Sequence, residues 1–286
     1  HVHINDDTIL LLFIANGVTA VRNMAGAPFH LELRQKVFEG EILGPTIFAA
    51  SPILEGIDKV WQSSVGVKTK QEASMYVSKF KSEGYDFIKI YHTLPDSLYN
   101  EVLRIADSID IPVVGHMPFG VDIQEILSSS QYSIEHVDLR PISSNVPMNE
   151  KIWMVGSSRK WLCPTLLVYK HMQTSFADSS LPIEYEQYVD TGTREFWQQG
   201  FRYPNNVYDM HKNMALGMFR HGGRYIAGTD CLNSYVLAGF SIHDELQEMV
   251  TAGIPEYDVL KTGTTNAAEF LKRHQQAGTI EGGKTA

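Results

Sequence analysis

Two histidines at the start of the sequence, His1 and His3, are separated by a single residue. In an extended strand the side chains at i and i+2 lie on the same face, so both imidazoles would point to one side. Two neutral imidazole nitrogens on one face make half of a tetrahedral zinc site. The motif HVHI therefore indicates a candidate metal site, although a His-x-His pair by itself also arises by chance.

Lys89 lies inside an apolar stretch, between Ile88 and Ile90. A buried ammonium without a partner costs several kcal/mol, so this lysine is expected to be paired, neutral or chemically modified. Three interpretations follow. The lysine reaches a nearby carboxylate, it forms a Schiff base with a carbonyl substrate, or it reacts with CO₂ to give a carbamate whose oxygens bridge two cations.

Three further residues, His116, His136 and Asp230, each close an apolar run just before a turn. One such residue alone usually caps the next helix or satisfies backbone groups. In a barrel of parallel strands, however, the carboxyl ends of all strands converge on the face that holds the active site. Together with HVHI and Lys89, these residues fall on the ends of different candidate strands, which predicts one shared site.

Short β-branched runs alternate along the chain with helical patterns, which is typical of βαβ units. The candidate strands are 17–24, 46–51, 86–91, 111–116, 132–136, 161–169 and 224–230. The clearest helical patterns are 69–83, 95–108, 121–130 and 206–221. If HVHI is the tail of a further strand, the pattern predicts an α/β fold of the (β/α)₈ TIM-barrel class. A doubly wound open sheet is the alternative, but no glycine-rich phosphate loop follows the first strand.

One long connection, 170–206, carries many aromatic residues. Connections of this length in compact domains are usually functional. We expect its part 184–200 to be helical. It either forms a lid over the site or is an ordinary packed excursion.

The composition excludes several classes of partner. The net charge is −9 and the pI is near 5.6, without a basic stripe, so neither nucleic acid nor an anionic membrane is expected as a partner. No apolar run reaches the roughly 18 residues that a spanning helix needs. Cys163 and Cys231 show no zinc-finger spacing and are expected to be small buried residues. The compartment stays open.

The order of the motifs HVHI, DFIKIY, VVGHMPFG, SIEH and GTD resembles the amidohydrolase superfamily, close to its imidazolonepropionase and Xaa-Pro dipeptidase-like branch. The stretch from SIHDELQEMV to GTIEGGK is similar to the part of that branch that follows the eighth strand. The resemblance extends from the first residue to about Lys284. It implies a metal-dependent hydrolase barrel that cleaves a C–N bond of an amide, peptide or cyclic amide by metal-activated water.

The resemblance also implies roles for individual residues. One Zn²⁺ or other divalent cation would be bound by His1, His3 and Asp230, and a second by His116 and His136. A carbamate on Lys89 would bridge the two ions, and Asp230 would move the proton of the reaction. The candidate substrate contacts are Tyr91, His92, Tyr169 and His243. The remaining histidines are expected on the surface or in packing positions: His30, His171, His211, His221 and His274.

The predicted domains are a catalytic barrel over 1–263 and, over 264–286, a C-terminal helix with the start of a segment leading to a missing β-sandwich. We expect the first strand and the flanking β-sandwich segments to be truncated. Two alternatives stay open: a Schiff-base lysine lyase or aldolase on the same barrel, and a metal-free, inactive fragment of the parent hydrolase. The expected partner is a small-molecule or dipeptide-like substrate, and assembly into a homo-oligomer is compatible with the sequence.

Overall fold

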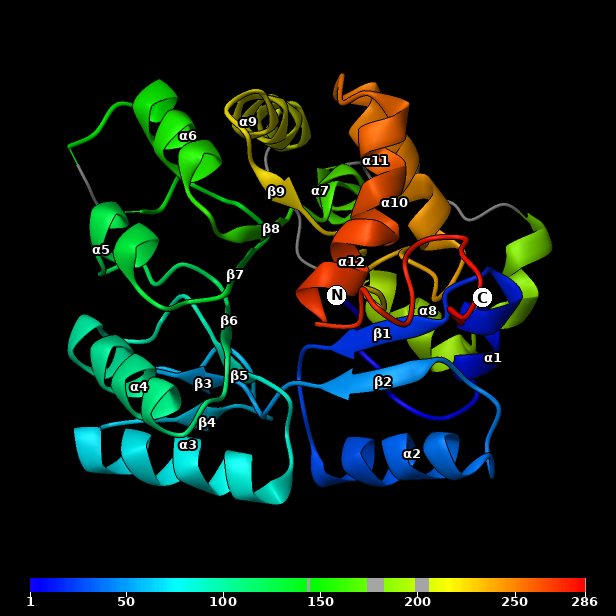
Figure 1. Ribbon diagram of the computed structural model, residues 1–286, viewed down its shortest axis with the longest axis horizontal. Helices are drawn as coiled ribbons and strands as arrows, with labels where there is room; N and C mark the ends of the chain where they lie inside the picture. The colour runs from blue at the N-terminus through cyan, green and yellow to red at the C-terminus, as the bar shows by residue number, and fades with distance from the viewer. Residues whose placement is uncertain (143–144, 174–182, 199–205, 286) are drawn as a thin grey trace.

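The computed structural model describes residues 1–142, 145–173, 183–198 and 206–285. Figure 1 shows short strands through the middle of the molecule and helices around them. The strands are β1 (Ala20–Asn23), β2 (Thr46–Ala49), β3 (Leu54–Glu55), β4 (Val65–Gly66), β5 (Ile88–Ile90), β6 (Val113–Gly115), β7 (Ser133–Glu135), β8 (Trp161–Cys163) and β9 (Arg224–Tyr225).

Helices follow most of the strands along the chain. They are α1 (Leu10–Ala15), α2 (Pro28–Glu39), α3 (Lys70–Glu83), α4 (Asp96–Ser108), α5 (Ile123–Ser128), α6 (Met148–Ser157), α7 (Leu166–Gln173), α8 (Thr191–Gln198), α9 (Val207–Arg220), α10 (Ser241–Thr251), α11 (Glu256–Gly263) and α12 (Thr265–Phe270), with a 3₁₀ helix η1 (Ile183–Tyr188). None of the helices in the described ranges is long and apolar enough to cross a membrane.

All paired strands are parallel, which confirms the predicted α/β class. β1 pairs with β2, and a seven-stranded sheet runs in the order β4-β3-β5-β6-β7-β8-β9. As continuous ladders the strands thus form two sheets and not one closed ring. Single parallel bridges join them, between Ala50 and Phe87 on one side and from Val2 to both Asn23 and Cys231 on the other.

The segment HVHI lies extended between β1 and the residues that follow β9. The Val2 N–H donates to the Arg22 carbonyl, and the Met24 N–H donates to the Val2 carbonyl. On the other side, the His3 N–H donates to the Cys231 carbonyl. The backbone around His1 and His3 is therefore held from both sides, as the strand-tail interpretation requires.

Strand β5 shows how the sheet separates core from site. Ile88 and Ile90 are buried in the large apolar cluster beneath α3 and α4. Lys89 alternates to the opposite face, level with Val114 of β6. Thr69 caps the N-terminus of helix α3, because its side chain accepts the Glu72 N–H. Gly84 caps the C-terminus with a φ of 93°, which suits glycine.

The prediction of one strand over 161–169 was wrong in its second half. The strand ends at Cys163, and helix α7 begins at Leu166. Pro164 has no N–H to donate to a ladder, and Thr165 has a left-handed φ of 48°. Sequence patterns also missed the two short strands β3 and β4, which have two residues each.

The long connection is described only in part, since 174–182 and 199–205 lie outside the described residues. The prediction of helix over 184–200 is confirmed in part, by the 3₁₀ helix η1 and by α8, while 199–200 lie outside the described residues. The Trp197 indole is buried and donates to the Leu232 carbonyl. A lid function stays a prediction, as does the domain boundary after 263. Cys163 and Cys231 are buried and unbridged, as expected.

Candidate metal centre

The strand ends bring together four imidazoles, one amine and one carboxylate, which we call the six-residue cluster. Its members are His1, His3, Lys89, His116, His136 and Asp230. The ring centres of His1 and His136 are 4.9 Å apart, and those of His116 and His136 are 4.6 Å apart. The residues singled out by sequence therefore lie in one place, although they come from separate segments of the chain.

Asp230 joins the two halves of this cluster. Its Oδ1 lies 3.1 Å from His1 Nε2 and 2.8 Å from His3 Nε2. Its Oδ2 accepts a hydrogen bond of 2.7 Å from Asn233 and lies 4.0 Å from His136 Nδ1. Burial by itself would raise the pKa of Asp230, but His1 and His136 hold it well below its usual value. The two carboxylate oxygens therefore have different surroundings and can have different roles.

Lys89 is 1% exposed and lies among the imidazoles. Its charge lowers the pKa of every histidine of the cluster. Burial, only partly offset by Glu135 and Asp230, lowers the pKa of Lys89 itself to about 8. In the described part of the chain no ion pair joins Lys89 to a carboxylate. A neutral amine is thus accessible near physiological pH, and only the neutral form reacts with CO₂ or a carbonyl.

Three buried polar atoms of the cluster are poorly satisfied. His116 Nδ1 has no hydrogen-bond partner among the described residues, and His1 Nε2 shares the single oxygen Asp230 Oδ1 with His3 Nε2. Such atoms are uncommon in folded proteins and are costly unless an ion or water satisfies them. Burial lowers the pKa of His116 well below its usual value and that of His136 to about 3, so both rings are neutral and offer lone pairs. The donor set of imidazole nitrogens and a carboxylate fits Zn²⁺ or a similar divalent cation.

The charge state of His1 supports the same conclusion. Burial, the largest single influence, lowers the pKa of His1, but the charge of Asp230 and the hydrogen bonds to Asp230 and Cys163 together raise it to about 10. A proton on His1 then supplies positive charge at the point where the ligand atoms of His1, His3 and Asp230 lie within 4.8 Å of one another. A cation at this point would replace that proton.

Sequence reasoning missed two charged residues, Glu135 and Arg22, that support His1 at Nδ1, the ring nitrogen that does not face Asp230. Glu135 Oε2 lies 2.8 Å from His1 Nδ1, and Arg22 binds both oxygens of Glu135 at 3.0 Å. Burial raises the pKa of Glu135, but Arg22 and His1 lower it well below its usual value. A charged residue in an apolar strand was the signal that singled out Lys89, and the same signal was present in SIEH and AVRN.

Two polar residues that orient cluster members were also missed. Asn233 donates to both the carbonyl and Oδ2 of Asp230, and the Thr165 hydroxyl lies 2.8 Å from His136 Nδ1. Thr165, His136 and Asp230 all have left-handed φ values, of 48°, 67° and 57°. Non-glycine residues in this region are uncommon and cluster at functional sites. Sequence patterns carry no signal for these contacts.

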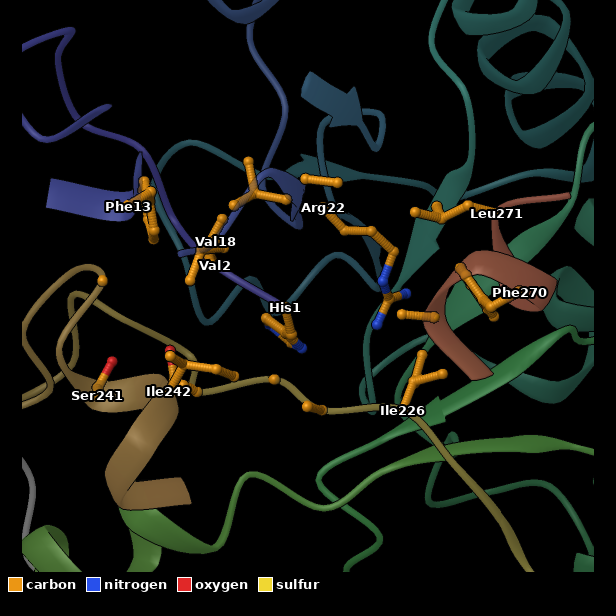
Figure 2. Close-up of a pocket in the computed structure, with 17 residues that line it drawn as sticks. His1, Val2, Phe13, Val18, Arg22, Ile226, Ser241, Ile242, Phe270 and Leu271 are labelled. Atoms are coloured by element: carbon orange, nitrogen blue, oxygen red, sulfur yellow. The ribbon is translucent and has the colours of Figure 1, made fainter. Parts of the chain in front are cut away.

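A cavity of about 80 Å³ lies beside His1 (Figure 2). It is lined by His1, Arg22 and mainly apolar side chains such as Phe13, Ile226 and Phe270. Since the other members of the six-residue cluster do not line it, this cavity lies behind His1 and is not where a substrate would meet the whole cluster.

The candidate substrate contacts differ in their position. The rings of Tyr91 and His92 lie 4.3 and 5.6 Å from that of His116, and His92 stacks on Phe119. The Tyr169 hydroxyl donates to the His136 carbonyl at 3.3 Å. His243, in contrast, is exposed on α10 and makes none of the contacts that join the cluster. The structure therefore brings Tyr91, His92 and Tyr169 next to the cluster, but not His243.

Among the remaining histidines, His30 is buried and its Nε2 donates to the Ile4 carbonyl. His211 is buried against Tyr169, whereas His221 and His274 are exposed. These positions agree with the expected packing and surface roles. His30 also has a specific role, because its hydrogen bond holds the backbone of Ile4, the residue that follows His3.

Replacing Glu135 with Gln should weaken zinc binding by about 10- to 100-fold, because residues that orient metal ligands typically contribute that much. The amide of this variant has no charge and only one acceptor oxygen, so its NH₂ group would face either Arg22 or His1, and the His1 tautomer would be less well fixed. Competition against a zinc chelator measures the effect. The control is Glu248→Gln on α10, since Glu248 is also buried but pairs with Lys170. Equal zinc affinity of Glu135→Gln and the wild type would contradict the supporting role.

Solved structures that share this fold include hydrolases of amide bonds by name. Bottromycin amidohydrolase matches with a TM-score of 0.82 and 26% identity over 96% of this chain and 66% of that chain. A Xaa-Pro dipeptidase with bound methionine in its active site has a TM-score of 0.70 and 18% identity, over 97% of this chain and 70% of that chain. Ochratoxinase from A. niger has a TM-score of 0.70 and 17% identity, over 97% and 66%.

The chain spans about two thirds of the length of these structures. No protein-family model and no curated protein sequence matches it. The similarity therefore rests on the tertiary fold.

Proposed function

Because the chain belongs to the amidohydrolase superfamily, as its motif order predicted, we propose that it is a metal-dependent hydrolase of a C–N bond. The observation that carries this proposal is the convergence of buried ligand atoms in the six-residue cluster: His1 Nε2 and His3 Nε2 both face Asp230 Oδ1, and His116 Nδ1 has no hydrogen-bond partner among the described residues. A packed core offers no reason to bury several imidazole nitrogens around one carboxylate oxygen. A site for divalent cations does.

The contacts support a division of the cluster into two sets of ligands. His1 Nε2, His3 Nε2 and Asp230 Oδ1 face one another and would hold one cation. His116 Nδ1 and the adjacent ring of His136 would hold a second. Lys89 lies among all four imidazoles and, as a carbamate, would bridge the sets. Its Nζ attacks CO₂, an N–C bond forms, and a proton leaves the nitrogen.

Bound divalent cations would supply the Lewis acidity that activates the attacking water and polarises the scissile carbonyl. The proton of that water would pass to Asp230, whose Oδ2 is turned away from His1 and His3 and held by Asn233. Asp230 would then deliver this proton to the leaving nitrogen. Glu135 and Arg22 would keep the lone pair of His1 Nε2 toward the cation during the reaction.

The substrate class follows from the fold and the surroundings of the cluster. Bottromycin amidohydrolase and the Xaa-Pro dipeptidase act, by their names, on amide or peptide bonds. We infer that this chain takes a dipeptide, an N-acyl amino acid or a cyclic amide. Tyr91, His92 and Tyr169 are the proposed contacts beside the ligands.

We further infer that the strands close into a (β/α)₈ barrel around this site. Val2 already bridges β1 to the residues after β9, and Ala50 bridges the end of β2 to the start of β5. The two sheets are joined at these two places by single bridges instead of regular ladders. A barrel would explain why chemistry-bearing residues from separate segments meet at one end.

A metal titration tests the proposed function directly. After treatment with a chelator, the protein should regain two equivalents of zinc in the presence of bicarbonate, together with hydrolysis of at least one member of a panel of dipeptides, N-acyl amino acids and cyclic amides. Zinc should also raise the free energy of unfolding, by about 2.7 kcal/mol at a free concentration 100 times the Kd. Fewer than one bound equivalent per chain would count decisively against a metal-dependent hydrolase.

A further inference from the structure

The hydroxyl of Thr165 makes a contact that its position in the chain does not call for. Thr165 directly precedes helix α7, where a threonine normally accepts a hydrogen bond from an N–H of the first turn. Instead its Oγ1 lies 2.8 Å from Nδ1 of His136, and both residues are buried. Thr165 therefore does not cap helix α7 with its side chain but contacts His136 of the six-residue cluster instead.

Glu245 of α10 takes over the capping role from 79 residues away. One carboxylate oxygen accepts the Leu166 N–H at 2.9 Å, and the other accepts the Leu167 N–H at 2.8 Å. Glu245 is fully buried, and burial raises its pKa to about 7. Above that pH the anion also interacts favourably with the helix dipole. Its carboxylate therefore anchors the backbone immediately after Thr165 and frees the threonine hydroxyl.

The same segment holds the backbone of His136. The His136 N–H donates to the Cys163 carbonyl at 2.8 Å, and the Tyr169 hydroxyl donates to the His136 carbonyl at 3.3 Å. The 4.0 Å from His136 Nδ1 to Asp230 Oδ2 is too long for a hydrogen bond. Among the described residues, Thr165 is therefore the group within hydrogen-bond distance of Nδ1 of His136.

We propose that Thr165 is a positioning residue for His136, and that Glu245 keeps Thr165 in place. When Nδ1–H donates to the Thr165 hydroxyl, the lone pair is on Nε2, which is then the nitrogen available to a cation. This inference rests on the proposed function, since it assigns the support of one ligand in the proposed metal centre.

The test compares zinc binding of Thr165→Val, Thr165→Ser and the wild type, by competition with a chelator. Valine has the same shape and branching as threonine but accepts no hydrogen bond, so the left-handed backbone is strained to the same extent. We expect the zinc that His116 and His136 would hold to bind about 10- to 100-fold more weakly in Thr165→Val, with the other equivalent retained. Thr165→Ser should restore binding to within a few-fold, and Glu245→Gln should give an intermediate loss.

The tautomer gives a readout that a purely structural role would not change. In the metal-free protein, ¹⁵N NMR should report the Nδ1–H form of His136 in the wild type and in Thr165→Ser, and a mixture of tautomers in Thr165→Val. The matched control is Thr262→Val, because Thr262 is also buried but donates to the Val259 carbonyl in α11. This control should lower the melting temperature and leave zinc affinity unchanged.

The outcomes separate the two proposals. Two equivalents bound equally well by the wild type and Thr165→Val would overturn the positioning role alone. An equal loss of zinc affinity in Thr262→Val would overturn it too, because general destabilisation would then account for the effect. A wild-type protein that binds no zinc would overturn the proposed function and this inference with it.

Discussion

Replacing Asp230 with Asn should lower kcat by about 10³-fold or more while the protein still folds. Asparagine keeps the shape of aspartate and its contact with Asn233, but its amide cannot accept the proton of the attacking water. The substitution also weakens the first set of proposed ligands, because Oδ1 of Asp230 lies 3.1 Å from His1 Nε2 and 2.8 Å from His3 Nε2. The measurement is kcat on the best substrate of the panel, at zinc concentrations that saturate the variant.

The control for this substitution is Asp209→Asn. Asp209 is exposed in the first turn of α9 and pairs only with Lys212 in the ion pairs of the described residues. Its replacement should leave kcat within about twofold of the wild type, since surface ion pairs contribute little. If Asp230→Asn, fully loaded with zinc, kept kcat within about tenfold of the wild type, Asp230 would not carry the proton.

Replacing Lys89 with Met should reduce the zinc stoichiometry from two equivalents to one or fewer. It should also lower kcat by about 10²-fold or more, a loss of about 3 kcal/mol in transition-state stabilisation. Methionine fills the buried volume of the lysine but cannot form a carbamate. Bicarbonate should stimulate zinc uptake by the wild type and have no effect on Lys89→Met. Metal analysis after equilibration with and without bicarbonate measures both effects.

Lys160→Met is the matched control, because burial lowers the pKa of Lys160 to about 8 as well. Lys160 lies outside the cluster and donates to the Gln131 carbonyl. Replacing Lys160 should lower the free energy of unfolding but leave the zinc stoichiometry unchanged. Borohydride in the presence of a carbonyl substrate distinguishes the alternative reaction: covalent labelling of Lys89 would favour a Schiff-base lyase and contradict the carbamate.

The ligands of the proposed metal centre could be predicted because each is marked by a local pattern. His116, His136 and Asp230 stand where an apolar run stops, and Lys89 interrupts one. Parallel strands that alternate with helices must place their carboxyl ends at the same edge. The pattern of single segments and the geometry of the fold class are therefore sufficient to bring these residues together.

The partners of the ligands could not be predicted in the same way. Glu245 caps a helix that begins 79 residues before it, and Glu135 reaches a histidine 134 residues away. Arg22 and Glu135 carried the signal of a charge in an apolar strand, but nothing in the sequence says that they face each other. Such pairs depend on how distant segments pack.

The sequence by itself predicted most of the strand and helix order, the resemblance to the superfamily and the six candidate ligands, because these depend on local periodicity, on motif order and on residue types at strand ends. The tertiary structure decided where β8 gives way to α7, which oxygen of Asp230 faces His1, and which side chain contacts Nδ1 of His136. The reason is that tautomers and rotamers are set by hydrogen bonds to side chains that only folding brings within about 3 Å. The opening HVHI shows both levels: its spacing identifies a ligand pair, and Arg22, Glu135 and His30 hold that pair in place.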